Sequence, residues 1–376
     1  MVVRLLAAVV CVAGAAVFVQ PALAAPSCAG RAATIVGTAG NNTLHGTPGR
    51  DVIVGLGGLD EIHGEGGDDF ICGGSFADTL YGGSGDDFVN GGSGSDFLTG
   101  GSGDDLVRGG RGTDTLYAGG RGDDVYEGGS AFTGNGHDRL SFERSPRPVH
   151  LDLLAASFGD VRGDRDVARG IETYAGSPDD DRLAGDRGPN QFFGLGGDDV
   201  IEGRGGSDFL DAGSGDDDVR GGPGRDSFND SSESDSLGSG NDIFRGGDEK
   251  DTFLVGDGIN TVHGGARRDY WRADLYPVSI DLAIGVASVA GDPNVIAGVE
   301  RVRAPCTQLL GDNGPNTLLC PTEQVGAPPG TVKGRGGNDR LDAHDGAVDG
   351  GSGFDRCRGA TIVNCEAAFR LAALPR

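Results

Sequence analysis

The chain has 376 residues, of which 73 are glycine, and its formal net charge is −26. So acidic a chain is repelled by nucleic acid and by anionic membrane surfaces, which excludes both as partners. Glycine at nearly three times its usual share makes ordering costly in backbone entropy. With 36% apolar residues, the chain is not expected to bury a deep core. The chain must therefore be disordered, or interactions other than a deep apolar core must hold it together.

Residues 1–24 are predicted to be a secretory signal peptide. Arg4 supplies the positive charge, an apolar stretch runs from Leu5 to Val19, and Ala22-Leu23-Ala24 provides the cleavage pattern. The stretch is shorter than the roughly 20 residues of a membrane span, although an N-terminal anchor is the alternative. We therefore expect a secreted, extracellular protein with no transmembrane segment after cleavage.

The cysteines indicate disulfide bonds. Of the seven, Cys11 leaves with the signal peptide, and an even number remains. Proximity in sequence favours Cys306–Cys320 and Cys357–Cys365, which leaves Cys28–Cys72, but the pairing stays open. A zinc site is the competing interpretation, and the absence of CxxC spacing disfavours it. The favoured set would staple the two ends of the protein.

A nine-residue unit repeats in tandem from residue 37. Residues 82–90, for example, read GGSGDDFVN. The sixth position is nearly always aspartate, with Asn42, Asn190 and Asn260 as substitutes, and the eighth position is aliphatic or aromatic. Internal periodicity of this kind is typical of solenoid proteins.

Each unit is expected to form a glycine-rich turn followed by a very short strand. Two units would complete one flattened coil, with successive coils about 4.8 Å apart. Asp69, Asp87 and Asp105 would then stack in one column. The opposite column would hold Asp60, Asp78, Asp96 and Asp114.

Such columns of carboxylates predict a metal. At an effective dielectric constant of 20, neighbouring charges about 5 Å apart repel by on the order of 3 kcal/mol. A divalent cation between adjacent turns would reverse the sign of this term. Calcium fits best because it accepts six to eight oxygens, backbone carbonyls included, in loose geometry, whereas magnesium needs a tighter octahedron and zinc prefers nitrogen and sulfur. The candidate ligands are Asp51, Asp60, Asp69, Asp78, Asp87, Asp96, Asp105, Asp114, Asp124, Asp181, Asp199, Asp208, Asp217, Asp226, Asp242, Asp251, Asp339 and Asp355.

The repeat GGxGxDxUx resembles the nonapeptide of RTX, or haemolysin-type, calcium-binding proteins. The resemblance implies an all-β, right-handed parallel β-roll, that is, a β-solenoid, with multiple Ca²⁺ ions between adjacent turns. The alternative is a disordered, acidic low-complexity tract, but disorder does not require an apolar residue at every ninth position. Without calcium, we expect the arrays to be disordered.

The repeats divide the chain into segments. Two spacers resemble each other, since Val149-His150-Leu151-Asp152 matches Val278-Ser279-Ile280-Asp281, and we interpret them as wider coils of the same solenoid. Residues 367–374 are expected to form a short amphipathic helix that caps the last coil. The predicted segments are an N-terminal cap (25–36), a first calcium-binding roll (37–127), spacer coils (128–175), a second roll (176–272), further spacer coils (273–310), a degenerate third roll (311–357) and a C-terminal cap (358–376).

The functional prediction is a calcium-binding protein with a structural or surface-adhesion role and no catalysis. The sequence lacks the HExxH and GxSxG motifs. Expected partners are calcium ions and a cell-surface or extracellular polysaccharide or protein. The alternative is a secreted hydrolase or lyase acting on polysaccharide, with its site in the spacers. Its candidate carboxylates would be Asp152, Glu172, Asp281 and Glu300.

Overall fold

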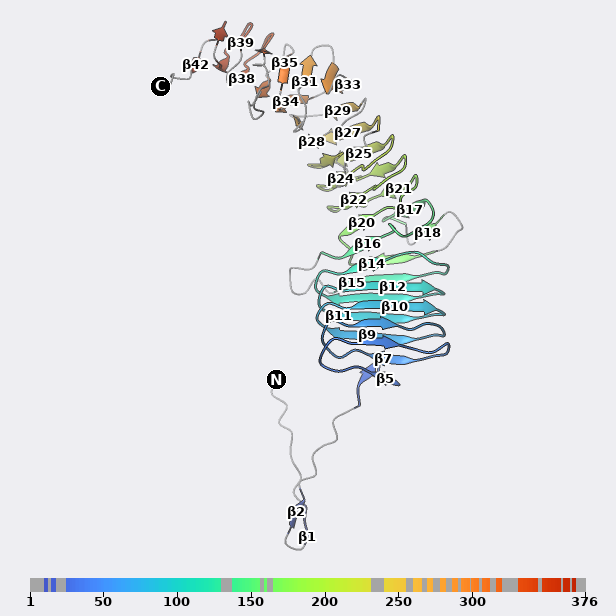
Figure 1. Cartoon of the computed structure of the whole chain (residues 1–376). Coiled ribbons are helices and arrows are strands. Elements are labelled where there is room, and N and C mark those ends of the chain that lie inside the picture. The colour runs from blue at the N-terminus through green and yellow to red at the C-terminus, as the bar shows by residue number, and fades with distance from the viewer. Residues whose placement is uncertain are drawn as a thin grey trace.

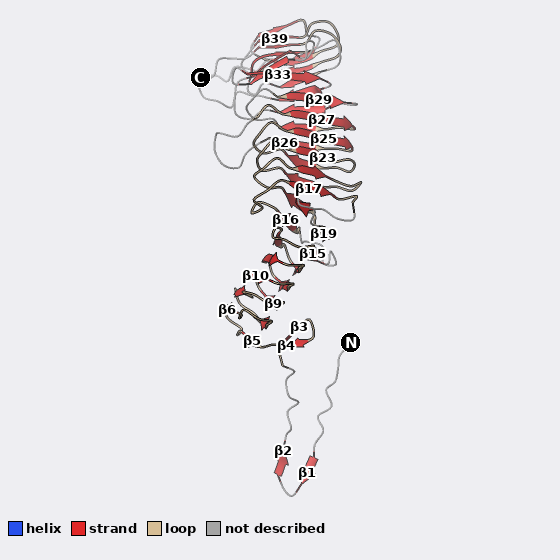
Figure 2. Ribbon diagram, turned by 90° about the vertical axis from the view of Figure 1, so that its right-hand side faces the viewer, coloured by secondary structure: helices blue, strands red, loops and turns tan. Residues whose placement is uncertain are grey.

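The computed structural model is an elongated stack of short strands (Figures 1 and 2). It describes residues 10–12, 15–17, 25–129, 137–155, 159–160, 165–230, 240–254, 260–265, 269–272, 278–281, 286–289, 292–297, 299–303, 306–311, 316–319, 331–343, 347–359, 361–365 and 367–369. Within these ranges the regular secondary structure is entirely β. The described residues include no helix long and apolar enough to cross a membrane.

Three sheets form the walls of the stack, and their strands are parallel except at three pairings in sheet III. Sheet I consists, in stacking order, of β5 (Ile35–Val36), β7 (Val52–Val54), β9 (Phe70–Ser75), β11 (Phe88–Ser93), β13 (Leu106–Arg111), β15 (Val125–Gly129) and β19 (Val167–Arg169). Sheet II consists of β6 (Thr43–His45), β8 (Glu61–His63), β10 (Thr79–Ser84), β12 (Phe97–Ser102), β14 (Thr115–Tyr117), β16 (Arg139–Ser141), β20 (Thr173–Ala175), β22 (Gln191–Phe193), β24 (Phe209–Asp211), β26 (Ser227–Asn229), β28 (Thr252–Leu254), β30 (Asp269–Arg272), β34 (Val299–Arg303), β36 (Thr317–Leu319), β38 (Arg340–Asp342), β40 (Arg356–Arg358) and β42 (Ala367–Phe369).

Sheet III replaces sheet I after the first spacer. Its strands are β18 (Gly159–Asp160), β17 (Val149–Asp152), β21 (Arg182–Ala184), β23 (Val200–Glu202), β25 (Asp218–Pro223), β27 (Ile243–Asp248), β29 (Thr261–Gly265), β33 (Asp292–Ala297), β32 (Val286–Val289), β31 (Val278–Asp281), β35 (Cys306–Leu310), β37 (Thr331–Lys333), β39 (Ala347–Asp349) and β41 (Thr361–Val363). Two antiparallel pairs stand apart from these sheets: β1 (Val10–Val12) with β2 (Ala15–Val17), and β3 (Ser27–Cys28) with β4 (Arg31–Ala32). The chain is therefore the predicted parallel β-solenoid.

The core is one side chain thick. Each eighth-position residue points inward and stacks on its counterpart in the next coil, as Ile53 does on Ile71 and Val89 on Val107. These four side chains are fully buried. In the second array several core residues are larger, and the rings of Phe228 and Phe253 stack with their centroids 4.6 Å apart. Alternation along each short strand thus produces the apolar column that the repeat predicts.

The spacers continue the solenoid but change one wall. Sheet II passes through the first spacer without a break, because β16 pairs with both β14 and β20. The other wall changes, since sheet I ends at β19 while sheet III starts from β17 and β18. The two near-copies, β17 and β31, each gain an antiparallel neighbour, β18 and β32 respectively. Each spacer thus adds an antiparallel strand to sheet III.

Two of the favoured disulfides are present. Cys28 bonds to Cys72, which holds the β3–β4 hairpin against sheet I, and Cys357 bonds to Cys365. The third expected pair involves Cys320, which lies outside the described residues, as does most of the predicted signal peptide.

The expectation of a C-terminal helix over residues 367–374 is wrong for residues 367–369, and residues 370–374 lie outside the described part of the chain. Residues Ala367–Phe369 form β42, which pairs in parallel with β40. An uncovered strand presents a row of backbone N–H and C=O groups, and pairing satisfies them. This tertiary demand outweighs the local helix preference of an alanine-rich segment.

Candidate metal centre

The sixth-position aspartates lie at the ends of the turns, directly before the strands. All the predicted ligands are buried, with at most 7% of their surface exposed. The glycine-rich turn delivers each side chain into the coil rather than toward solvent. Burial of this many carboxylates in one thin solenoid has to be compensated.

The carboxylates form ladders along the two edges of the solenoid. The backbone N–H of Asp69 donates to Oδ1 of Asp87 at 2.8 Å, and that of Asp87 donates to Oδ1 of Asp105 at 2.8 Å. On the opposite edge, the N–H of Asp78 donates to Oδ1 of Asp96 at 2.8 Å. The two predicted columns of the first array are therefore present. The same bond joins the second-array residues Asp181, Asp199, Asp217 and Asp242 on one edge and Asp208, Asp226 and Asp251 on the other, and it links Asp339 to Asp355.

One oxygen of most carboxylates remains without a hydrogen bond. The backbone N–H groups, which sequence reasoning missed, satisfy Oδ1 only. The buried Oδ2 atoms that receive no hydrogen bond include those of Asp60, Asp69, Asp78, Asp87, Asp96, Asp105, Asp114, Asp199, Asp208, Asp217, Asp226 and Asp251. Rows of orphaned anionic oxygens inside a protein call for a cation or a proton.

A backbone carbonyl of the next coil lies close to many of the orphaned oxygens. A Cβ placed on Gly64 would lie 2.5 Å from Oδ2 of Asp69 and would overlap the carbonyl oxygen of Gly82 in the next coil. Two oxygens converge at this first position, which favours glycine there, although one unit of the second array has Ala212. Those oxygens, a carboxylate and a backbone carbonyl, are the donors that calcium prefers.

The ladder carboxyl groups have raised pKa values, and burial is the main cause. It raises the pKa of Asp87 to about 7, that of Asp105 to about 8 and that of Asp199 to about 9. The backbone N–H donor lowers each pKa in part, and repulsion from neighbouring aspartates raises it further. Loss of hydration, rather than the mutual repulsion expected from the sequence, is therefore the larger penalty on the charged ladder.

Three predicted ligands have both carboxylate oxygens engaged. The turn N–H of Thr47 donates to Oδ2 of Asp51, and Ser177 donates through both its N–H and its hydroxyl to Asp181. The hydroxyl of Tyr126 donates to Oδ2 of Asp124 at 2.9 Å. Asp51 and Asp181 stand near the beginnings of their arrays, so the protein itself caps the start of these ladders.

The ladders also continue through residues that the repeat pattern missed. In the first spacer, Asp114 donates its N–H to Asp138, Asp138 donates to Glu172, and Asp124 donates to Asp166, at 2.8–2.9 Å. The signal is a local one: residues 133–141 read TGNGHDRLS, which keeps the aspartate, the apolar residue two positions later and two of the three glycines, but has threonine at the first position. A search for the aspartate and the apolar residue alone would have found Asp138 and Asp166.

A second acidic ladder runs along one edge only. The fifth-position residues Asp68, Asp86 and Asp104 are exposed, and the N–H of Asp104 donates to Oδ1 of Asp86 at 2.9 Å. On the opposite edge of the first array the fifth positions are neutral: Asn41, Leu59, Ala77, Ser95 and Thr113. The two edges of the roll therefore differ in surface charge.

The donor set fits calcium if backbone carbonyls take part. In the described ranges, no three His, Cys, Asp or Glu side chains gather closely enough to hold a metal. Any ion would therefore combine one or two ladder carboxylates with carbonyl oxygens of the glycine-rich turns. An all-oxygen set with many neutral donors suits calcium and does not suit zinc.

The candidate catalytic carboxylates of the spacer are held in structural contacts. Both oxygens of Asp152 accept hydrogen bonds from the Arg204 guanidinium, at 2.6 and 2.8 Å, which lower the pKa of Asp152 to about 2. Glu172 belongs to the ladder described above. The side chains of Asp281 and Glu300 lie outside the described residues.

Comparison with known proteins identifies the repeats. The family model of the RTX calcium-binding nonapeptide repeat matches residues 30–62, 45–80, 63–98, 81–116, 99–140, 175–210, 193–228 and 236–262, about half of the chain. No curated protein matches the sequence. The matched ranges hold most of the ladder aspartates, whereas Asp166, Asp339 and Asp355 lie outside them. With this match and these ladders, the chain belongs to the family of proteins built from RTX calcium-binding nonapeptide repeats.

Proposed function

We propose that this is a secreted structural protein without catalytic activity, whose folding outside the cell is driven by calcium. The observation that carries the proposal is the rows of buried Oδ2 atoms that no protein group satisfies. Ions between successive coils would compensate their charge and join each coil to the next.

The energy of the ions would substitute for the thin core. Calcium sites in extracellular modules often have Kd near 10⁻⁴–10⁻³ M. At ten times Kd, each occupied site adds about 1.4 kcal/mol to the free energy of unfolding. A dozen such sites would supply about 17 kcal/mol, more than the net stability of a typical domain.

The same linkage between calcium binding and folding would keep the chain unfolded inside the cell and folded outside it. In the cytosol, where calcium is scarce, the buried carboxylates would be uncompensated and the arrays would stay unfolded and exportable. After export, calcium would bind the folded form only and shift the equilibrium toward it.

The contacts in the first spacer support a role without catalysis. Arg204 neutralises Asp152, and Glu172 is used as a ladder residue, so neither carboxylate is presented as an acid or base in a cleft. A catalytic carboxylic acid needs a pKa near the working pH, and the pKa of Asp152 is far below it.

Far-ultraviolet circular dichroism of the full chain tests the proposal. The metal-stripped protein is titrated with calcium, and magnesium serves as the matched control at equal ionic strength. We expect strand signal to rise with calcium and to change little with magnesium. A spectrum of folded strands that persists at neutral pH after the metal is stripped would contradict the proposal.

A further inference from the structure

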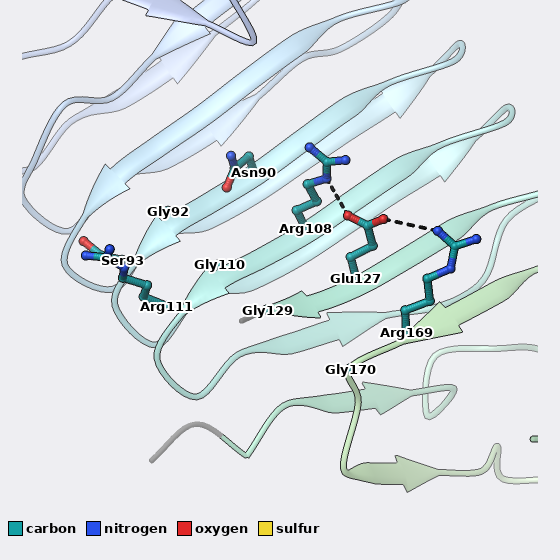
Figure 3. Close-up of a pocket in the computed structure, with 10 residues that line it drawn as sticks. All are labelled: Asn90, Gly92, Ser93, Arg108, Gly110, Arg111, Glu127, Gly129, Arg169 and Gly170. Atoms are coloured by element: carbon teal, nitrogen blue, oxygen red, sulfur yellow. Dashed lines mark hydrogen bonds and ion pairs between the residues drawn. The ribbon is translucent and has the colours of Figure 1, made fainter. Parts of the chain in front are cut away.

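A groove runs across the outer face of sheet I near the first spacer (Figure 3). Its volume is about 660 Å³. Strand register places Gly92, Gly110 and Gly129 in one row, which forms the floor. On one side of the floor stands the row Asn90, Arg108, Glu127 and Arg169, and on the other side stand Ser93 and Arg111. The groove therefore follows the axis of the solenoid.

The groove carries excess positive charge on a chain of net charge −26. Glu127 accepts contacts from two arginines, Arg108 at 2.6 Å and Arg169 at 3.7 Å. Arg111 forms no ion pair within the described part of the chain. The groove thus holds three arginines and one glutamate, and the side chains of Arg108 and Arg169 are 43% and 69% exposed and remain accessible.

Cross-strand pairing alone does not explain this charge. On sheet III, Arg220 and Arg245 stand in a similar row, but there Arg220 contacts both Glu202 and Asp218, and Arg245 contacts Asp218. A third arginine, Arg182, also pairs with Glu202. The last residue of β27, which corresponds to Arg111 as the last residue of β13, is Asp248. The row on sheet III is balanced by acids, as expected of a purely structural ladder. The positive charge of the groove on sheet I is not balanced by acids in this way.

The surroundings favour a linear ligand that carries both acidic and hydroxyl groups. Guanidinium groups pair with carboxylate or sulfate through two parallel hydrogen bonds. Asn90 and Ser93 add neutral groups able to bond hydroxyls. The strand spacing, about 4.8 Å, is close to the length of one sugar ring, so successive sugars could meet successive strands. The exposed ladder of Asp68, Asp86 and Asp104 precedes the strands, whereas the groove lies where the strands end.

We propose that this groove binds a linear acidic glycan, with Arg108, Arg111 and Arg169 pairing with its carboxylate or sulfate groups. The proposal rests on the proposed calcium-folded roll, because the groove exists only when the coils are stacked. Calcium in the ladders also removes much of the negative charge that would repel such a ligand, and beyond about 8 Å the remaining surface charge is screened at physiological ionic strength.

Calorimetric titration of the calcium-loaded full chain tests the inference. The probes are a galacturonate hexamer, a heparin hexasaccharide, a neutral maltose-series hexamer and hexaglutamate. We expect at least one acidic oligosaccharide to bind, and the neutral one not to bind. Absence of binding by both acidic sugars, or tighter binding of hexaglutamate than of either, would overturn the proposal.

Two variants locate the site. Arg111→Gln removes a charge with no ion pair to disturb, and Arg220→Gln, which removes a charge from sheet III together with its ion pairs to Glu202 and Asp218, is the control. We expect Arg111→Gln to weaken binding about tenfold, or about 1.4 kcal/mol, and Arg220→Gln to leave it unchanged. Equal affinities of the two variants would overturn the assignment to this groove. Circular dichroism of each variant with calcium, which should match the unsubstituted protein, separates a failed groove from a failed calcium-folded roll.

Discussion

At each ladder position, the fold uses one carboxylate oxygen and leaves the other unsatisfied. In Asp87, Oδ1 accepts the N–H of Asp69, whereas Oδ2 is buried and has no hydrogen bond. The neighbouring Asp86 is exposed and belongs to the second acidic ladder. Two adjacent residues of the same type thus have different roles, which makes them a matched pair for mutation.

Asp87→Asn is expected to have opposite effects with and without calcium. The amide removes an anionic ligand, so the calcium-loaded protein should lose roughly 1–2 kcal/mol of unfolding free energy. It also removes a buried charge, so the metal-free protein should become more structured. Chemical denaturation in calcium, together with circular dichroism without it, measures both effects. Asp86→Asn should change neither, and equal effects of the two substitutions would refute the distinction.

The raised pKa values predict a pH dependence that calcium reverses. In the folded, metal-free roll the pKa of Asp87 is about 7 and that of Asp105 about 8, both above the value near 3.9 in an unfolded chain. The folded form therefore binds extra protons, and its stability, present at acid pH, is lost as the pH rises through these values. Calcium must displace the same protons, so its affinity should fall as the pH falls.

Circular dichroism in metal-free buffer from pH 9 to pH 5 tests this dependence. We expect strand signal to increase as the pH falls below about 7. The double variant Asp87→Asn/Asp105→Asn should show a weaker dependence on pH. Loss of structure on mild acidification of the metal-free protein would contradict the assigned sign.

At the scale of the element, the repeat is a turn that is crowded at its first position, where glycine is usual and Ala212 is an exception in the second array. Gly64 faces both Oδ2 of Asp69 and the carbonyl oxygen of Gly82, and the backbone on both sides is fixed by strand pairing. Gly40, in the first turn, is not restricted in this way, because a Cβ there would meet only the Thr38 hydroxyl, at 3.9 Å.

Gly64→Ala is expected to disrupt the coil in which it lies. A methyl group there must displace backbone or a ladder carboxylate, which should cost about 2–4 kcal/mol and weaken calcium binding to the first array. Gly40→Ala should change the free energy of unfolding by less than about 1 kcal/mol. Denaturant unfolding in saturating calcium compares the two. Comparable stability of both variants would show that the first position is not sterically closed.

At the scale of the whole molecule, the two arrays are joined by one continuous wall and one interrupted wall. Sheet II runs through the first spacer, but sheet I ends at β19 and sheet III starts from β17 and β18. In a solenoid, stability is transmitted by contacts between neighbouring coils. A spacer with one broken wall should therefore couple the arrays less tightly than the coils within each array are coupled.

The arrays are expected to fold as two units in a calcium titration. Hydrogen–deuterium exchange of the full chain, read by peptide, should show protection of residues 37–127 and 176–230 arising at separate calcium midpoints. Asp87→Asn should shift only the first midpoint, and Asp199→Asn only the second. A single midpoint that both variants shift equally would show that the spacer transmits folding without loss.

Much of this architecture follows from the sequence because the repeat is local. A nine-residue period with aspartate at the sixth position and an apolar residue at the eighth places both side chains by alternation alone, and the columns of Asp60 to Asp114 and of Asp69 to Asp105 follow from it. Proximity in sequence favoured the Cys357–Cys365 pair and left Cys28–Cys72 over, but the sequence kept the pairing open, and the structure contains both bonds.

Only the tertiary structure decided the features that depend on a neighbouring coil. These features all join residues from different coils. They are the backbone donors to the ladder carboxylates, the use of Glu172 in place of a ladder aspartate, the ion pair of Asp152 with Arg204, and the pairing of β42 with β40. The groove arises in the same way, from side chains on four stacked strands. The physical reason is that the repeat specifies how each coil turns, whereas the stacking of coils decides which polar and charged groups meet. Stacking therefore decides which charges find a partner in the adjacent coil and which do not.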